Sequence, residues 1–238
     1  IKSIGRLYEI LPELDQTIEV EQDLKWHPEK YVFEHLMQSL DAAAKLSYSN
    51  FYEKLIVTYA SLCHDLGKVT TTKIVDGHIK SPGHAEEGVP LARKMLRRIT
   101  KKKDLINSVI VLIRYHMLPS QFISLNSSLA AYRRLALKLK GYANLKMLAK
   151  LAIADRQGRN GSSSEPLTTH IDFVDEFIAR ANKAEVFKEP QKPILHGRDI
   201  SDVVKPGPLM GKLLKYAYEL QLKKGIKDKQ VLRELTIK

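Results

Sequence analysis

Residues 50–68 read NFYEKLIVTYASLCHDLGK. Apolar side chains recur at helical spacing through this stretch, and Asn50 is suited to cap the start of a helix that Gly67 then ends. The stretch therefore predicts an amphipathic helix that carries His64 and Asp65 at its carboxyl end. The helix dipole favours a histidine at the carboxyl end of a helix but disfavours an aspartate there. The position of Asp65 therefore indicates that a cation lies close to its carboxylate.

Helical periodicity continues on both sides of this stretch, and few alternating β-branched runs suggest strands, so we expect an all-α fold. The same apolar spacing places His35 in mid-helix beside a buried stripe. A short β-hairpin is the exception, because an Asp76-Gly77 turn predicts one after the His-Asp pair, as a wall of the site. Helices are expected over residues 31–46, 84–99, 104–117, 128–140, 143–154, 169–186 and 209–224.

The bulk composition narrows the class of protein and its setting. With 238 residues, of which 44% are hydrophobic, the chain can bury a sizeable core. The single cysteine, Cys63, excludes an internal disulfide framework, and no apolar run reaches the roughly 18 residues that a membrane span requires. We therefore expect a soluble, cytoplasmic protein with no membrane partner. The chain begins at Ile1, and we favour a piece of something longer over a processed start.

A formal net charge of +12 indicates a polyanionic partner, because clustered lysine and arginine side chains gain free energy by releasing counterions from phosphates. Any one cluster is typical of a solvated helix face. Together they favour RNA or another phosphorylated ligand. The clusters are Arg93, Lys94, Arg97, Arg98 and Lys101 to Lys103, then Arg133, Arg134, Lys138 and Lys140, and in the tail Lys212, Lys215, Lys223, Lys224, Lys227 and Lys229.

Imidazole and carboxylate side chains recur along the chain on or beside helical segments. Each has an ordinary explanation when taken alone, such as a buried histidine satisfied by a hydrogen bond. Taken in order they favour a metal site for hydrolysis, because this donor set suits divalent ions such as Zn, Fe, Ni or Mn. Cys63 shares the apolar stripe of its helix, which favours a buried hydrophobe over a nucleophile. The candidates are His35, His64, Asp65, His84, His116 and Asp155.

In this order the candidates resemble the HD superfamily of metal-dependent phosphohydrolases, whose pattern is His, His-Asp, optionally two further His, and a final Asp on separate helices. Shorter motifs resemble more closely the HD domain carried by bacterial CCA-adding enzymes, the tRNA nucleotidyltransferases. These motifs are Trp26-His27-Pro28-Glu29, Gly83-His84, Asp155-Arg156-Gln157-Gly158-Arg159 and Gly197-Arg198-Asp199-Ile200. Two positions depart from that branch, Lys30 where glycine is usual and Leu36 where threonine is common, and they bear on the substrate rather than on the metal.

The resemblance implies an HD-domain helical bundle over residues 27–160, after an N-terminal linker helix region over residues 1–26. A C-terminal helical extension over residues 161–238 would follow as a candidate for contacting tRNA. The resemblance also implies a divalent transition metal, namely Ni, Mn, Fe, Co or Zn with Mg as a further candidate, bound as one or two ions. His35, His64, Asp65 and Asp155 would hold one ion, and His84 and His116 would help to hold a second, with Asp65 bridging, or would bind the substrate phosphate.

The same resemblance gives roles to residues near the metal ligands. Asp65 and Lys68 would carry catalysis, and Lys68 and Arg159 would bind the phosphate, although Lys68 could equally be an ordinary surface lysine. The implied enzyme is a phosphatase or 2′,3′-cyclic phosphodiesterase acting on nucleotides or RNA ends. No nucleotidyl transfer is expected from this chain alone, because no two aspartates are separated by one residue, as a two-metal Asp-x-Asp pair requires.

Two alternative functions stay open at this point. The chain could be the tRNA-binding body of a CCA-adding enzyme that lacks its catalytic head, with a vestigial metal site. It could also be a hydrolase of dinucleoside polyphosphates, which rests on the same ligand pattern. The sequence leaves the physiological substrate and the oligomeric state open.

Overall fold

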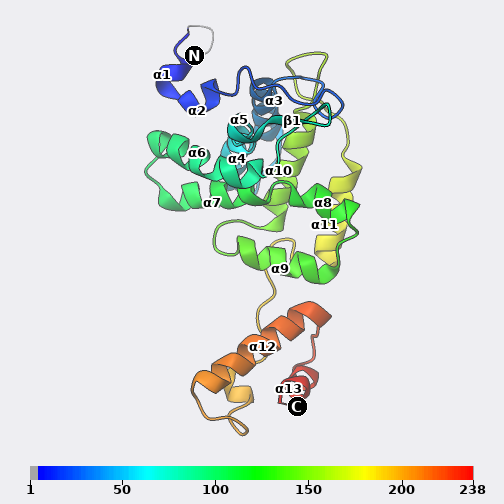
Figure 1. The fold of residues 1–238 in the computed structure, drawn as a ribbon. Helices are drawn as coiled ribbons and strands as arrows, with labels where there is room; N and C mark the ends of the chain where they lie inside the picture. Colours follow the sequence, from blue (N-terminus) through cyan, green and yellow to red (C-terminus); the bar gives the residue numbers. More distant parts are fainter. Residues whose placement is uncertain (1–4, 238) are drawn as a thin grey trace.

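The computed structural model describes residues 5–237 and is predominantly helical, with one small two-stranded sheet among those residues (Figure 1). This confirms the predicted all-α class. The N-terminal half contains α1 Leu7–Ile10, α2 Pro12–Asp15, α3 Val32–Lys45, α4 Phe51–Cys63, α5 Lys68–Thr71, β1 Lys73–Val75, β2 His78–Lys80, α6 His84–Ile99 and α7 Lys103–Tyr115. The C-terminal half contains α8 Leu118–Ser124, α9 Leu129–Leu139, α10 Leu145–Gln157, α11 Asp172–Lys183, the short 3-10 helix η2 Gly197–Asp199, α12 Pro208–Lys224 and α13 Lys229–Ile237.

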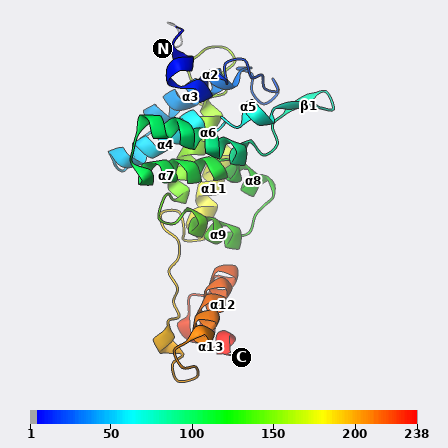
Figure 2. The same cartoon turned by 60° about the vertical axis from the view of Figure 1, so that its left-hand side comes forward.

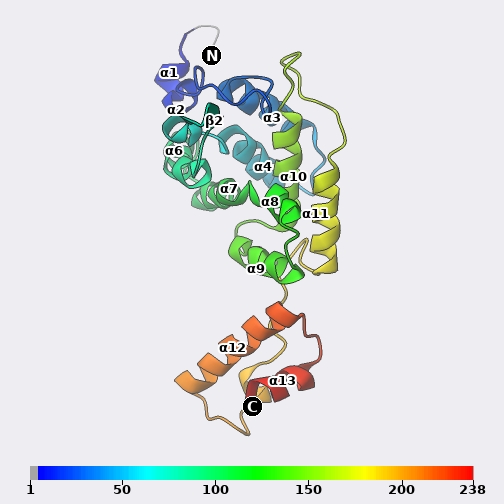
Figure 3. The same ribbon diagram turned by 45° about the vertical axis from the view of Figure 1, so that its right-hand side comes forward.

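Helix α10 lies at the centre of the body, against α3, α4 and α11, and α7 packs against both α4 and α6 (Figure 3). The apolar stripes of these helices form one core, in which Leu36, Leu112 and Leu148 are fully buried. Each such side chain contributes about 1.5–3 kcal/mol when it is removed from water. The core therefore fixes α3, α4, α7 and α10, the four helices that carry or precede most of the candidate metal ligands.

Helix starts follow the local sequence closely. The Asn50 side chain accepts a hydrogen bond from the main-chain amide of Glu53 at 2.8 Å, which confirms the predicted cap of α4. Some helices lie outside the predicted ranges, among them α5, α8 and α13. Pro119 lies in the first turn of α8, and α13 forms beyond the last predicted helix.

The end of α4 differs from the prediction. This helix ends at Cys63, and Gly67 keeps a right-handed helical φ of −66°, so the expectation that Gly67 terminates the helix is wrong. Gly67 instead lets two segments touch, because a Cβ built on it would lie 2.1 Å from the His84 carbonyl oxygen. This close crossing holds the start of α6 against the turn that carries Asp65.

The predicted hairpin is present between α5 and α6. Strands β1 and β2 pair antiparallel, with Ile74 opposite Ile79. Asp76 and Gly77 form the turn with φ values of 53° and 75°, the left-handed pair that a two-residue hairpin requires. The hairpin projects from the body, and its second strand leads directly to the start of α6 (Figure 2).

The main core continues past residue 160, where the sequence indicated a boundary, and includes Val174 and Phe177 of α11 and Val186 after that helix. The loop after α10 is tied to α3, because Gln38 bonds to the main chain of Asn160 at 2.9 Å through both its amide nitrogen and its oxygen. A second, smaller apolar cluster begins at Leu195 and joins η2, α12 and α13.

The C-terminal helices form a small lobe beneath α9 (Figure 1). Arg133 of α9 is buried and donates a hydrogen bond to the carbonyl oxygen of Leu222, near the carboxyl end of α12. Its guanidinium also lies beside Gly225, the left-handed residue that ends α12. Arg133 belongs to one of the basic clusters seen in the sequence. In the structure its guanidinium connects the C-terminal lobe to the body.

Two expectations drawn from composition can be compared with the structure. No helix between residues 5 and 237 is both long enough and apolar enough to cross a lipid bilayer. Cys63 is fully buried, and burial raises the pKa of its thiol, so the side chain behaves as a small hydrophobe rather than as a nucleophile.

Candidate metal centre

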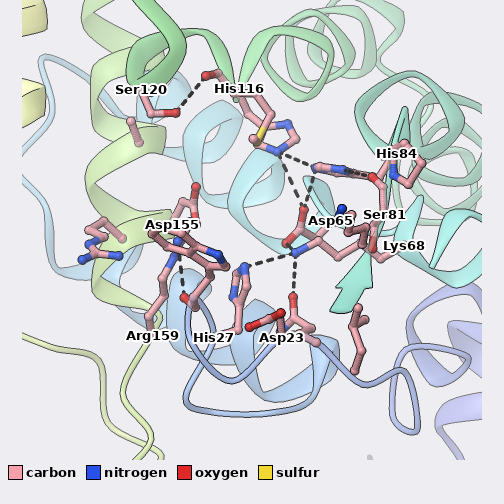
Figure 4. Close-up of a pocket in the computed structure, with 18 of the residues that line it drawn as sticks. Asp23, His27, Asp65, Lys68, Ser81, His84, His116, Ser120, Asp155 and Arg159 are labelled. Atoms are coloured by element: carbon pink, nitrogen blue, oxygen red, sulfur yellow. Dashed lines mark hydrogen bonds and ion pairs between the residues drawn. The ribbon is translucent and has the colours of Figure 1, made fainter. Parts of the chain in front are cut away.

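The predicted ligands converge from distant segments of the chain, and four of them, Asp65, His84, His116 and Asp155, line one cavity (Figure 4). The convergence follows from the bundle, because each ligand lies in or next to a helix of the main core. His35 lies in the first turn of α3 rather than in mid-helix as predicted, His64 and Asp65 in the turn after α4, His84 at the first position of α6, His116 directly after α7, and Asp155 in the last turn of α10.

One half of the cluster contains His35, His64 and Asp155. The Nε2 atoms of the two histidines are 3.1 Å apart. Asp155 Oδ1 lies 3.2 Å from the Nε2 atom of His35 and 3.9 Å from that of His64. Three donor atoms of two chemical kinds therefore surround one point, which is the arrangement that a divalent ion requires.

The other half contains His84, His116 and Asp65. The Nε2 atoms of these two histidines are also 3.1 Å apart, and Asp65 Oδ1 lies 3.2 Å from the first and 3.7 Å from the second. Asp65 Oδ2 faces the first half, at 3.5 Å from His35 Nε2 and 3.4 Å from His64 Nε2. Each oxygen of this one carboxylate thus faces a different pair of imidazoles.

Main-chain carbonyl groups fix the orientation of all four imidazoles. A carbonyl oxygen only accepts, so each ring carries its proton on Nδ1 and turns Nε2 toward the cluster. This is the support that metal-bound histidines need, and the residues present fit one or two divalent ions. The Nδ1 partners are the carbonyls of Gly158 for His35 at 3.0 Å, Ser61 for His64 at 2.9 Å, Ser81 for His84 at 2.8 Å and Ile113 for His116 at 2.7 Å.

The two carboxylates of the cluster are ionised despite their surroundings. Burial opposes the ionisation of Asp65, but the Lys68 ammonium and the neighbouring histidines hold its pKa well below the usual value. Burial likewise opposes the ionisation of Asp155, and the Arg159 guanidinium beside it holds the pKa of that carboxyl well below its usual value. Both side chains are therefore available as anionic ligands.

The paired histidines respond to their surroundings in opposite directions. Burial opposes the protonation of His35, but hydrogen bonds to Asp155 and Glu29 raise its pKa to about 9. Burial lowers the pKa of His64, the other member of the pair. The two rings of this pair therefore differ in their affinity for a proton, and both turn an Nε2 atom toward the same point.

The pKa values of His84 and His116 are also shifted in opposite directions. Burial opposes the protonation of His84, but its hydrogen bond to Asp65 raises the pKa of the ring. Burial lowers the pKa of His116 to about 3. In each pair one ring therefore has a raised pKa and the other a lowered pKa, and binding of a divalent ion by these side chains would compete with protonation.

Lys68 and Arg159, the predicted phosphate-binding residues, both line the cavity above the cluster. Lys68 is buried rather than on the open surface, with its Nζ atom 2.7 Å from Asp65 Oδ2 and 2.6 Å from Gln22 Oε1. Arg159 donates to Asp155 Oδ1 at 2.8 Å. Each cation is thus held beside a carboxylate that could bind metal.

Glu29 and His27 were not among the predicted residues of the site, yet both lie beside it. The buried Glu29 carboxylate lies between two rings, with its Oε1 atom 2.8 Å from His27 Nδ1 and 2.9 Å from His35 Nδ1. Burial opposes its ionisation, yet bonds to both rings lower the pKa of Glu29 to about 2. Its charge orients His35 from outside the cluster. The motif Trp26-His27-Pro28-Glu29 was the available signal, although it contributed only to the resemblance.

The cavity above the cluster has a volume of about 720 Å³, which is enough for a nucleotide-sized ligand. Its walls combine positive charge with apolar and aromatic surface. The hairpin contributes Ile79 and Lys80 to these walls, as predicted for a segment beside the site. Other lining residues are Gln22, Asp23, Trp26, His27, Ser81, Pro82, Met117, Ser120, Ala152, Arg156 and Phe173.

Comparison with known proteins identifies the family of the chain. The profile of the HD domain family matches residues 32–159, a range that includes every candidate metal ligand. The Multifunctional CCA protein of Methylobacillus flagellatus is 35% identical to this chain over 117 residues, which are 49% of this chain and 26% of that protein. No solved structure matches the chain.

Proposed function

Because this chain belongs to the HD domain family of metal-dependent phosphohydrolases, we propose that it hydrolyses phosphate esters of nucleotides or of RNA ends. The expected reaction is that of a phosphatase or a 2′,3′-cyclic phosphodiesterase. The observation that carries the proposal is the position of Asp65, whose two oxygens face two imidazole pairs at the floor of a cavity wide enough for a nucleotide. This arrangement supports two ions that share one carboxylate.

The chain's own groups can be assigned to steps of such a reaction. A divalent metal held by these side chains would supply a water that ionises near neutral pH and would polarise a phosphoryl oxygen. Lys68 neutralises charge on the phosphoryl oxygens, and its contacts with Asp65 and Gln22 fix its position before the substrate arrives. Arg159 can bind a second phosphoryl oxygen while its other nitrogen stays on Asp155.

The similarity to a Multifunctional CCA protein supports RNA as the source of the substrate, with tRNA as the proposed partner in a cytoplasmic setting. The same similarity motivates the alternative of a tRNA-binding body with a vestigial metal site. A vestigial metal site would no longer need the hydrogen bonds that orient its ligand side chains. The complete set of donors and the carbonyl contact on every imidazole therefore favour the enzyme over the scaffold.

Metal dependence gives the direct test. Purified chain incubated with adenosine 2′-phosphate or adenosine 2′,3′-cyclic phosphate should release product when Ni²⁺, Mn²⁺, Co²⁺ or Mg²⁺ is added. Excess EDTA should reduce the rate to background, because Lys68 and Arg159 alone cannot ionise a water. Product is measured by phosphate release or by chromatography of the nucleoside.

A dinucleoside polyphosphate belongs in the same assay, since its hydrolysis in preference to the monophosphates would favour that alternative reaction. Absence of turnover with every metal, together with tight tRNA binding that weakens steeply with salt, would contradict the enzyme and support the scaffold.

A further inference from the structure

The rim of the cavity carries a large aromatic side chain that the reaction does not use. Trp26 is the only tryptophan of the chain, it lines the cavity, and 58% of its surface is exposed. An exposed indole at the mouth of a cavity leaves a wide apolar face that a planar ligand can cover. The position therefore suits a contact with the substrate rather than with the core.

The main chain of Trp26 is held by hydrogen bonds on both sides. Its amide donates to the carbonyl of Asp23 at 3.0 Å, and its own carbonyl faces the Arg159 guanidinium at 3.4 Å. The next residue, His27, reaches Lys68, with 3.4 Å between the His27 Nε2 and Lys68 Nζ atoms. The main chain of Trp26 thus contacts Arg159, and its neighbour His27 contacts Lys68, so the segment that carries the indole lies beside both proposed phosphate-binding cations.

The indole is accessible from the cavity that it lines. Lys25 lies over the ring, with its Nζ atom 5.2 Å from the centroid, but Lys25 does not line the cavity. A ligand in the cavity can therefore reach the indole without displacing a residue that lines the site. Phe173 and Met117 add apolar surface to the same cavity, and Arg156 adds positive charge without an ion pair within residues 5–237.

We propose that Trp26 is the surface on which the base of the substrate stacks. The proposal rests on the proposed function and narrows its substrate class, because the site then selects nucleoside phosphates and strand ends over sugar phosphates. Stacking of a base on an aromatic side chain is expected to change affinity by roughly 5- to 150-fold. It tolerates different bases, because each base has a flat face of its own.

Tryptophan fluorescence tests the contact without any need for turnover. Titration of the whole chain with adenosine 2′-phosphate, in EDTA and again with Mg²⁺, should quench the emission of Trp26 in a saturable way. Ribose 5-phosphate and inorganic phosphate should leave the emission unchanged at the same concentrations. Free N-acetyltryptophanamide in parallel corrects for light absorbed by adenine.

Equal quenching by the sugar phosphate, or no saturable quenching by the nucleotide under either condition, would overturn the proposal. The phosphohydrolase assay is unaffected by this readout, so failure of stacking and failure of the enzyme can be told apart. A chain that is quenched but inactive with every metal would keep the base contact while contradicting the proposed reaction.

Variants provide a second measure of selectivity. Trp26→Ala should raise KM for adenosine 2′-phosphate by roughly 5-fold or more, and by much more than it raises KM for ribose 5-phosphate, which has no base to stack. Trp26→Phe should restore most of the affinity, since it keeps a ring. Tyr142→Ala, at an exposed tyrosine outside the cavity, serves as the matched control. Equal losses on both substrates would assign Trp26 a structural role and contradict base stacking.

Discussion

Replacement of Asp65 by asparagine is expected to reduce hydrolysis by roughly 10³-fold, the equivalent of about 4 kcal/mol in the barrier. The carboxylate presents Oδ1 to His84 at 3.2 Å and Oδ2 to His64 at 3.4 Å, so it serves both halves of the cluster. An amide offers one oxygen and no charge, and its nitrogen cannot bind metal. Steady-state kinetics and metal content should therefore fall together in Asp65→Asn.

A folding control is needed for this variant, because Asp65 also neutralises the buried Lys68. Breaking a buried ion pair costs about 3–5 kcal/mol, which circular dichroism and thermal melting will register as a lower Tm. Asp41→Asn, at an exposed carboxylate of α3, should leave both activity and melting unchanged. A folded Asp65→Asn chain with full metal content and undiminished turnover would contradict the bridging role.

Substitution of Gly67 by alanine is expected to destabilise the fold by about 3 kcal/mol, at the upper end of the usual range for overpacking. The new Cβ would lie 2.1 Å from the His84 carbonyl oxygen and 2.5 Å from the Gly88 amide nitrogen. Both atoms belong to the main chain of α6, so the helix itself must move. For a chain of this size Tm should fall by roughly 6–12 °C.

The same substitution elsewhere should have the opposite effect. Gly211 lies in α12 with nothing within 4 Å of a Cβ built on it, so Gly211→Ala should stabilise its helix by about 0.5–1 kcal/mol. Displacement of α6 also moves His84, and Gly67→Ala should lose metal affinity even in its folded fraction. Equal melting temperatures for the Gly67→Ala chain and the parent would contradict the close contact between Gly67 and the main chain of α6.

Much of the site could be predicted because its residues carry local signals. His64 and Asp65 follow a strongly apolar helix, at a carboxyl end where the helix dipole disfavours a carboxylate unless a cation lies nearby. The all-α class follows from periodicity, which reports the face of a helix that must be buried. The order of the remaining ligands then gives the family, which the profile match over residues 32–159 confirms.

Other features depend on contacts between distant parts of the chain and leave no local signal. Gly67 reads as a helix terminator in the sequence, but its role is set by the main chain of α6. The carbonyl that orients His35 belongs to Gly158, 123 residues away. Glu29 is a buried carboxylate whose partners come partly from α3, so periodicity alone cannot distinguish it from a surface glutamate.

The predicted basic clusters are also changed by contacts between distant residues, which the sequence alone does not reveal. Lys94 and Arg98 were assigned to a basic face, yet both pair with the buried Glu13 of α2. In the tail, Lys227 and Lys229 pair with acids of the chain itself. RNA binding by the remaining cations stays a proposal, and its surface is smaller than the sequence indicates.

The most direct test of the account is anomalous scattering from crystals of the metal-loaded chain, with elemental analysis of the same sample. The account predicts metal within about 2.0–2.2 Å of histidine Nε2 atoms in both pairs. Asp65 should lie between the two ions as a shared ligand. Crystals grown with metal that show no anomalous peak among His35, His64, His84 and His116, or peaks only elsewhere, would contradict it.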